Sequence, residues 1–237
     1  MDELNQQAGM DESGKGDLFG TPVCACVVAD TATLDRLRAI GVRDSKTIDD
    51  RVELYQLETM IRQNTRVYLR SLDMPKYNRL MAKPQANLNK LLAWLHAHAL
   101  HDALLEGPVA HAILDQFAST DYVSGYLRKL MPDLPENLLE QRPRAESETV
   151  VAAASICARV GYLKQMDRLS RQSGRVLLRG CSREAQAQAR SFLEQQGVAS
   201  FQSVTKLHFK CARRMLREYL AKNQSSEFKN LPTTMHV

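Results

Sequence analysis

The pattern of hydrophobic and polar positions predicts strands early in the chain and helices late. Residues 23–29 (VCACVVA) are apolar at every position, which is typical of a strand buried on both faces. Residues 67–72 and 109–114 are shorter strand candidates. Between them, apolar residues recur at helical spacing over 87–105 and end at a Gly-Pro pair. This order predicts a mixed α/β fold.

The second half of the chain is predicted to be helical. Residues 147–173 form a long periodic segment, with Ser147 placed as its N-terminal cap and Gly174 as its stop. Two more helices are expected over 183–196 and 205–221. The run of alanines near the start of the long helix would let it pack close to a sheet.

At 237 residues, the chain has the length of one large domain or two small ones. A hydrophobic content of 44% and a charged content of 25% exclude collagen-like, coiled-coil and wholly disordered proteins. The last residues are polar and poor in periodic apolar positions. We therefore expect one domain over residues 1–221, followed by a polar, disordered C-terminal tail over 222–237.

The N-terminus lacks the basic and apolar regions of a signal peptide, and the chain contains no apolar run of about 18 residues. We therefore expect no contact with a membrane. The five cysteines are an odd number and include no CxxC pair, which argues against a zinc site. Cys24 and Cys26 would share one face of a strand. Free buried thiols indicate a reducing compartment, so we expect a cytoplasmic protein.

Charge is distributed unevenly along the chain. The net charge is +5, but residues 1–150 contain 17 Lys and Arg against 22 Asp and Glu, whereas residues 151–237 contain 15 against 5. In the second of these regions, basic residues recur every three or four positions in two rows, and such a row usually marks the solvent-exposed face of a helix. Two rows in a region so poor in acids favour contact with phosphates instead. The rows are Lys164, Arg168, Arg171 and Arg175, then Lys206, Lys210, Arg213 and Arg217.

Residues 9–20 (GMDESGKGDLFG) contain the highest concentration of candidate functional residues. On a regular strand the adjacent Asp11 and Glu12 point to opposite faces, so the strand must twist or end there if both serve one site. Gly14 and Gly16 permit such a change, and the turn offers backbone N–H groups beside a lysine, which suits a phosphate. It is not a Walker A loop. The alternative is a capped turn with a surface acidic pair.

Three more acids are candidates for the same site. Asp115 follows an apolar strand, at the sheet edge where α/β sites gather, although a helix N-cap is the more common role of such a residue taken alone. Glu146 and Glu148 precede the alanine-rich helix, where the helix dipole alone favours acids. Together with Asp11 and Glu12, Asp115 and Glu146 would form an oxygen site for Mg²⁺ or Mn²⁺. Beside a basic surface, such a site indicates two-metal-ion phosphodiester hydrolysis.

Three histidines lie on the predicted helix over 87–105. His98 and His101 are three residues apart and could form a metal pair. Trp94 and several leucines surround them, and no third ligand is near in sequence. We interpret His96, His98 and His101 as core or surface residues.

The string Asp11-Glu12-Ser-Gly-Lys-Gly-Asp17-x-Phe-Gly resembles the opening motif of ribonuclease HIII, a branch of the type 2 ribonuclease H family. Asp17 and the late Lys-Leu-His-Phe favour this branch over ribonuclease HII, which typically has Gly-Pro-Leu-Ala and a late tyrosine that reads a single ribonucleotide. The resemblance covers about residues 9–215. Its further motifs are Asp44-Ser45-Lys46, Tyr77-Asn78, Asn87-Leu-Asn89, Ala93-Trp-Leu-His96, Leu114-Asp115-Gln-Phe117, Glu146-Ser147, Ala152-Ala-Ala-Ser-Ile156 and Lys206-Leu-His-Phe209.

The resemblance implies an RNase H-like fold, a five-stranded mixed sheet flanked by helices. It implies an endoribonuclease that cleaves the RNA strand of RNA/DNA hybrids with two ions, leaving 5′-phosphate and 3′-hydroxyl ends. No small-molecule cofactor is implied, and we expect a monomer. The implied catalytic and metal-binding residues are Asp11, Glu12, Asp115 and Glu146. The implied nucleic-acid contacts are Ser13, Gly14, Lys15, Gly16 and Lys46, with His208 as an assisting or merely packed residue.

This sequence departs from the family pattern in three places. Only eight residues precede Gly9, so we expect a catalytic domain without the usual N-terminal TBP-like domain. Thr21 precedes Pro22 where the family pattern is commonly Phe-Gly-Pro, which shifts the turn locally. Glu148 stands where lysine is common and competes with Glu146 as the fourth ligand. An HII-like enzyme that cleaves at single embedded ribonucleotides, or a non-catalytic hybrid-binding module, remains the alternative.

Overall fold

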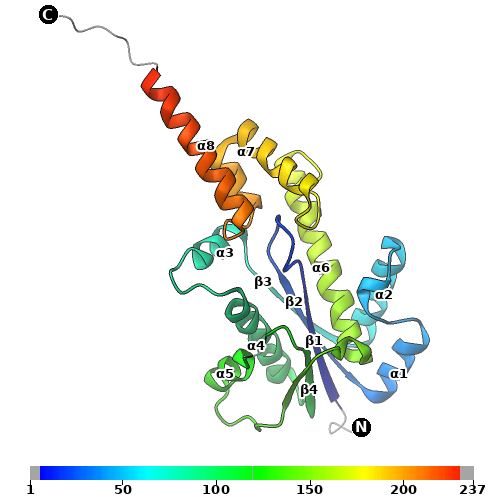
Figure 1. Ribbon diagram of the computed structural model, residues 1–237. Helices are drawn as coiled ribbons and strands as arrows, with labels where there is room; N and C mark the ends of the chain where they lie inside the picture. The colour runs from blue at the N-terminus through cyan, green and yellow to red at the C-terminus, as the bar shows by residue number, and fades with distance from the viewer. Residues whose placement is uncertain (1–5, 119, 230–237) are drawn as a thin grey trace, which may run out of the picture.

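The computed structural model describes residues 6–118 and 120–229 and contains a five-stranded mixed sheet (Figure 1). The spatial order is β3-β2-β1-β4-β5, with β1, β2 and β3 antiparallel and with β4 and β5 parallel to β1. The mixed sheet and all three predicted strands are confirmed. The strands are β1 (Gln6–Ser13), β2 (Val23–Asp30), β3 (Arg66–Ser71), β4 (His111–Asp115) and β5 (Leu139–Arg142).

Helices cover both faces of the sheet, and further helices gather at the end where β1 stops (Figure 1). One face carries α1 (Thr31–Ala39), α2 (Arg51–Asn64) and α6 (Thr149–Ser173). The other carries α4 (Leu88–Glu106) and α5 (Tyr122–Leu130). At the end of the sheet lie α3 (Met74–Met81), α7 (Arg183–Val204) and α8 (Lys210–Lys229), and the short 3₁₀ helices are η2 (Ser45–Thr47) and η3 (Ala145–Ser147).

The continuous apolar run of β2 is buried on both faces, as its sequence predicts. Ala25 and Val27 pack in the core on the α6 face, and Cys26 and Val28 pack against α4 and β4. Cys24 and Cys26 are fully buried free thiols on the α4 face. Burial raises the pKa of Cys26 to about 12. Both thiols are therefore neutral core residues.

Helix α6 crosses β1 at very short range, because neither side presents a large side chain. A Cβ atom on Gly9 would lie 2.3 Å from the carbonyl carbon of Val150, a distance that no side chain tolerates. Ala152, Ala153 and Ala154 continue the close contact as buried residues of α6. The predicted close packing of this helix is confirmed, and it brings the segment that precedes α6 to the edge of the sheet.

Of the two predicted ends of the long helix, only the C-terminal end is confirmed. Gly174 ends α6 with φ of +68°, a left-handed conformation that glycine adopts without steric cost. Ser147 is not the N-cap. It closes η3, and Glu148 occupies the cap position without a side-chain capping bond. The 3₁₀ turn takes up the residues that propensity alone would give to the helix.

The two last helices differ from their predicted bounds. Helix α7 continues to Val204 through a break at Gly197, whose φ is +75°. Helix α8 begins at Lys210 and extends to Lys229, eight residues into the predicted tail. Its polar residues include strong helix formers, and low hydrophobicity does not by itself end a helix. The rest of the predicted tail, 230–237, lies outside the described residues. Within the described ranges, no helix is both long and apolar enough to cross a membrane.

Candidate active site

The carboxylates predicted for the site lie where β1 and β4 run side by side. Met10 of β1 is the neighbour of Leu114 of β4 in a parallel register, so Asp11 and Asp115 follow at the same level. The side chains of Ala112 and Leu114 face α4, whereas Ile113 faces α6. By alternation, Asp11 and Asp115 both face α6.

Asp11 is a buried carboxylate with 8% of its surface exposed. Its Oδ1 accepts a hydrogen bond from the backbone N–H of Glu12 at 2.7 Å, and Ser155 of α6 donates a second. Burial, followed by repulsion from the charge of Glu12, raises the pKa of Asp11 to about 6. The fold therefore concentrates negative charge at this point at an energetic cost, which a bound cation would relieve.

Asp115 and Glu146 form a second pair of carboxylates. The backbone N–H of Ala145 donates to Asp115 Oδ1 at 3.1 Å, which places η3 directly beside the end of β4. Burial raises the pKa of Asp115, and the neighbouring charge of Glu146 contributes in the same direction. Glu146 Oε2 is buried, and among the described residues it has no hydrogen-bond donor. Two facing carboxylates without a donor between them suit a divalent cation.

Glu12 points to the opposite face of the sheet, as strict alternation along β1 requires. Its Oε2 lies 3.0 Å from His96 Nε2 of α4, and its Oε1 lies 3.7 Å from Lys15 Nζ. Phe117 stacks on the His96 ring at a centroid distance of 5.5 Å. Lys15 Nζ lies 5.3 Å from the centroid of the same phenyl ring. β1 ends one residue later, at Ser13, so the strand stops after Glu12 without turning Asp11 and Glu12 to the same face.

The four acids do not form a closed cluster as they stand. Among residues 6–118 and 120–229, no three Asp, Glu, His or Cys side chains are grouped closely enough to hold a metal ion. Asp11 and Asp115 face the α6 side and Glu146 lies beside Asp115, whereas Glu12 contacts His96 on the α4 side. The donor set nevertheless fits Mg²⁺ or Mn²⁺, because it consists of carboxylate oxygens, one of them buried without a partner.

Glu148 has a partner that Glu146 lacks. Arg142 Nη2 of β5 donates to Glu148 Oε1 at 2.5 Å, and Arg142 Nε lies 3.1 Å from Glu140 Oε1. Glu148 is therefore held in a surface ion-pair network. This arrangement favours Glu146 over Glu148 as the fourth acid of the site.

The Gly-Lys-Gly loop is anchored to the core at Gly14 and exposed at Gly16. Gly14 has φ of +84°, and a Cβ there would lie 2.4 Å from the ring of Tyr162. Lys206 Nζ donates to the backbone oxygens of Gly14, at 2.7 Å, and of Asp17. By contrast, Gly16 is exposed, with no atom within 4 Å of the position of a Cβ. The backbone at Gly16 is therefore accessible to a ligand.

Lys206 is wholly buried, so its predicted place in a phosphate-binding row is wrong. It precedes α8, and burial lowers its pKa to about 7. Its side chain is used to hold the loop, which a surface pattern cannot indicate. The other members of that row, Lys210, Arg213 and Arg217, lie exposed on α8.

The first predicted row is not a continuous free surface either. Arg175 lies beyond the end of α6, over the ring of Phe192 at 5.1 Å, where it donates to Gln195. Lys164 lies 3.3 Å from the buried Glu58. Lys164 is exposed but paired, so Arg168 and Arg171 are the members of this row on α6 that are exposed without an ion pair among the described residues.

Lys46 lies on η2, beside the acidic site. The Asp44 side chain accepts a hydrogen bond from the Lys46 backbone N–H at 3.1 Å, which fixes the turn. The exposed ammonium group is close enough to Asp115 to oppose the rise of that pKa. Ser13, Gly14, Lys15 and Gly16 follow one another from the end of β1 into the loop. The predicted nucleic-acid contacts therefore border the carboxylates on two sides.

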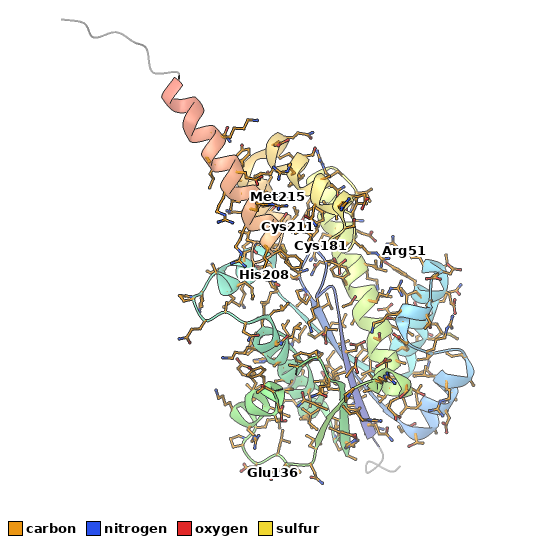
Figure 2. The ribbon with its side chains drawn as sticks, in the orientation of Figure 1. Arg51, Glu136, Cys181, His208, Cys211 and Met215 are labelled. Carbon is orange, nitrogen blue, oxygen red and sulfur yellow. The ribbon has the colours of Figure 1, made fainter. Side chains whose placement is uncertain are left out.

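Other residues have roles that the sequence did not indicate or left open. His96 is buried, as interpreted, but no local pattern pairs it with Glu12, 84 residues away. Thr21 is buried and bonded to Gln165 and to the Leu72 backbone, so side-chain contacts hold the altered turn. His208 lies near the start of α8 (Figure 2), and its Nδ1 is 3.5 Å from the Oη of Tyr77. Burial and nearby cations lower its pKa to about 4.

Comparisons with known proteins agree with this geometry. A family model described as Ribonuclease HII matches residues 8–212. The chain is 40% identical over 213 residues to a ribonuclease HIII of Chlamydia muridarum and 35% identical over 208 residues to one of Protochlamydia amoebophila. These alignments cover 88% of this chain and 68% and 67% of the relatives. The solved structure of Bst-RNase HIII in complex with Mn²⁺ superposes with a TM-score of 0.79 at 30% identity, covering 91% of this chain and 70% of that one.

Proposed function

Because this chain belongs to the ribonuclease HII family and, within it, to the ribonuclease HIII proteins, we propose that it hydrolyses the RNA strand of RNA/DNA hybrids. The observation that carries the proposal is that Asp11 and Asp115 lie at the ends of the neighbouring strands β1 and β4, with Glu146 beside Asp115 and a buried Glu146 oxygen that has no donor. An open Gly-Lys-Gly loop lies directly beside them.

We assign Asp11, Glu12, Asp115 and Glu146 as the residues that hold two divalent ions, Mg²⁺ or Mn²⁺. When bound, the ions supply the activation of water and the stabilisation of the leaving 3′ oxygen, which give 5′-phosphate and 3′-hydroxyl ends. The raised pKa values of Asp11 and Asp115 support this assignment, because burial and, to a smaller extent, a neighbouring carboxylate disfavour the charged form of each until a cation binds. The Mn²⁺ complex of a homologous ribonuclease HIII supports it as well.

The residues that follow β1 would bind the RNA strand. Ser13, Gly14 and Gly16 follow the end of the strand, with the backbone of Gly16 exposed, and Lys15 extends from the same loop as a cation. A backbone N–H or carbonyl of this loop can recognise the 2′-hydroxyl, the group that distinguishes RNA from DNA. On the other side of the acids, Lys46 would bind a phosphate.

The rest of the hybrid would contact the basic face of α8. Lys210, Arg213, Arg214 and Arg217 are exposed on this helix, and only Arg214 lies within ion-pair distance of an acid among the described residues, at 3.9 Å from Glu218. Because α7 and α8 share a core with the loop after β1, this face is rigidly connected to the catalytic end. We treat the described residues as one catalytic domain that includes α8.

The decisive experiment compares two substrates in Mg²⁺ and in Mn²⁺. Cleavage at several positions of an all-ribonucleotide strand in a hybrid is expected, with weak cleavage of a duplex that contains one ribonucleotide. Preferred cleavage at the single ribonucleotide would instead identify an HII-like enzyme. Tight, salt-sensitive binding without turnover in either metal would identify a non-catalytic hybrid-binding module.

A further inference from the structure

A second basic surface, distinct from that of α8, lies on α3 and the start of α4. Between Asp73 and Asp102 the chain contains no Asp or Glu, whereas it contains four Lys or Arg residues. These cations, Lys76, Arg79, Lys83 and Lys90, are all exposed. Within the described ranges none of them forms an ion pair, whereas cations elsewhere on the surface commonly do. Uncompensated positive charge on a helix surface suits a polyanion.

This surface contains a groove of about 420 Å³ between α3, the start of α4 and α5. Leu80, Leu91 and the rings of Trp94 and Tyr126 line it. Lys76 and Lys90 lie at the groove, and no acidic residue lines it. A ring flanked by cations offers stacking and charge at once, which is the combination that binds a nucleotide.

The groove lies next to the candidate active site. Because α4 leads into β4, which runs parallel to β1, the first turns of α4 lie at the end of the sheet where β1 and β4 stop. Trp94 is two residues before His96, the partner of Glu12, and it packs with Phe117 in one apolar cluster. Phe117 in turn contacts Lys15. A strand that leaves the acids on the Glu12 side therefore meets this groove.

We propose that the groove is a subsite for an unpaired nucleotide in a single-stranded segment that adjoins the hybrid. The proposal rests on the proposed function, and it adds a preference among substrates. The groove is too small for a duplex, and a base in a duplex has no free face to stack on Trp94. An unpaired base can stack, while Lys76 and Lys90 contact the phosphates beside it.

Trp94 is the only tryptophan of the chain, so its fluorescence reports on this groove alone. The experiment titrates the full chain, in EDTA to prevent cleavage, with a blunt hybrid and with the same hybrid carrying a single-stranded DNA or RNA tail on either strand. We expect at least one tailed hybrid to quench Trp94 and to bind about tenfold more tightly than the blunt one. Equal affinities and unchanged emission for every tailed hybrid would overturn the subsite.

Two variants with a matched control locate the effect. Tyr126→Leu removes a ring and Lys90→Gln removes a charge, and both should reduce the advantage of the tail while blunt-hybrid affinity stays the same. Arg36→Gln, which changes an exposed cation on α1 against the other face of the sheet, should leave that advantage intact. Quenching by the blunt hybrid that is as strong as by the tailed one would show that paired nucleic acid reaches Trp94 and would contradict the proposal.

The same protein preparation separates this proposal from the proposed function. Cleavage of the blunt hybrid in Mg²⁺ or Mn²⁺, without any effect of a tail, would leave the enzyme assignment intact and refute the subsite. An effect of the tail without cleavage in either metal would support the subsite and refute the enzyme assignment.

Discussion

His96 and Glu12 form a buried pair between the centre of α4 and the end of β1, with His96 Nε2 3.0 Å from Glu12 Oε2. The imidazole is fully buried, and Phe117 stacks on it. Nδ1 of His96 has no partner among the described residues, so the hydrogen bond to Glu12 is the one polar contact described for this ring. The pair orients a carboxylate that strand alternation turns away from the other three acids.

Removing this contact should impair catalysis through Glu12. We expect His96→Leu to lower kcat and Mn²⁺ affinity by about 10–100-fold with little change in KM, because second-layer partners orient the residues that hold a metal. His96→Gln, which can still donate, should recover most of the loss. Single-turnover cleavage and Mn²⁺ binding followed by electron paramagnetic resonance measure the two effects. His98→Gln is the control, since His98 contacts Trp94 and no acid. A decrease in thermal stability alone would indicate a packing role.

Asp11→Asn should abolish cleavage and stabilise the metal-free protein. The pKa of Asp11 is about 6 in the folded state against 3.8 as its ordinary value, so the folded state binds more protons between those pH values. Stability contributed by this group therefore falls as pH rises through that window, by about 3 kcal/mol. Urea denaturation in EDTA should show the variant more stable than the native chain at neutral pH, with the difference disappearing near pH 4. A less stable variant at neutral pH would contradict the view that burial and the charge of Glu12 destabilise the ionised Asp11.

Glu146→Gln and Glu148→Gln should differ sharply. The first replaces the carboxylate whose Oε2 lacks a donor, so metal-dependent cleavage should fall by about a hundredfold or more and the pKa of Asp115 should decrease. The second breaks an exposed ion pair with Arg142, which contributes at most about 1 kcal/mol. Cleavage rates at saturating metal test the pair. Greater loss in Glu148→Gln would reverse the assignment of the fourth acid.

Lys206→Met should detach the loop from its support. The variant leaves the backbone oxygens of Gly14 and Asp17 without their donor, so we expect weaker hybrid binding and slower cleavage. Burial lowers the pKa of Lys206 to about 7 from 10.5, so above pH 7 the unfolded state binds more protons. The native chain should therefore gain stability from pH 7 towards pH 10 relative to the variant. If the free energies of unfolding of the native chain and the variant depend on pH in the same way over this range, the buried amine is not the titrating group.

Alanine substitutions at the two glycines of the loop should affect different properties, stability at Gly14 and substrate binding at Gly16. Gly14→Ala puts a methyl group into the Tyr162 ring at a left-handed φ, so the free energy of unfolding should fall by about 2 kcal/mol or more. Gly16→Ala meets no atom within 4 Å, so stability should change by less than about 0.5 kcal/mol. The added methyl group should nevertheless raise KM for the hybrid by obstructing the exposed backbone. Unchanged KM in Gly16→Ala would remove the loop from the substrate contact.

Local sequence was sufficient for features that depend on near neighbours. The apolar run of β2, the helical period of α4 and the stop of α6 at Gly174 follow from side-chain alternation and backbone freedom. The motif of residues 9–20 was sufficient to indicate the family. It did not define where each acid points, because that depends on which element covers each face.

Tertiary structure alone decided how the acids are partnered. The register of β1 with β4 places Asp11 beside Asp115, and the close approach of α6 at Gly9 brings Glu146 to the same edge. Contacts across 84 residues for His96 and across 192 for Lys206 convert a core histidine and a surface-like lysine into supports of the site. Charge and spacing are properties of the sequence. Burial and long-range partners, which decide whether a charge faces solvent, a carbonyl oxygen or a carboxylate, arise only when the chain packs.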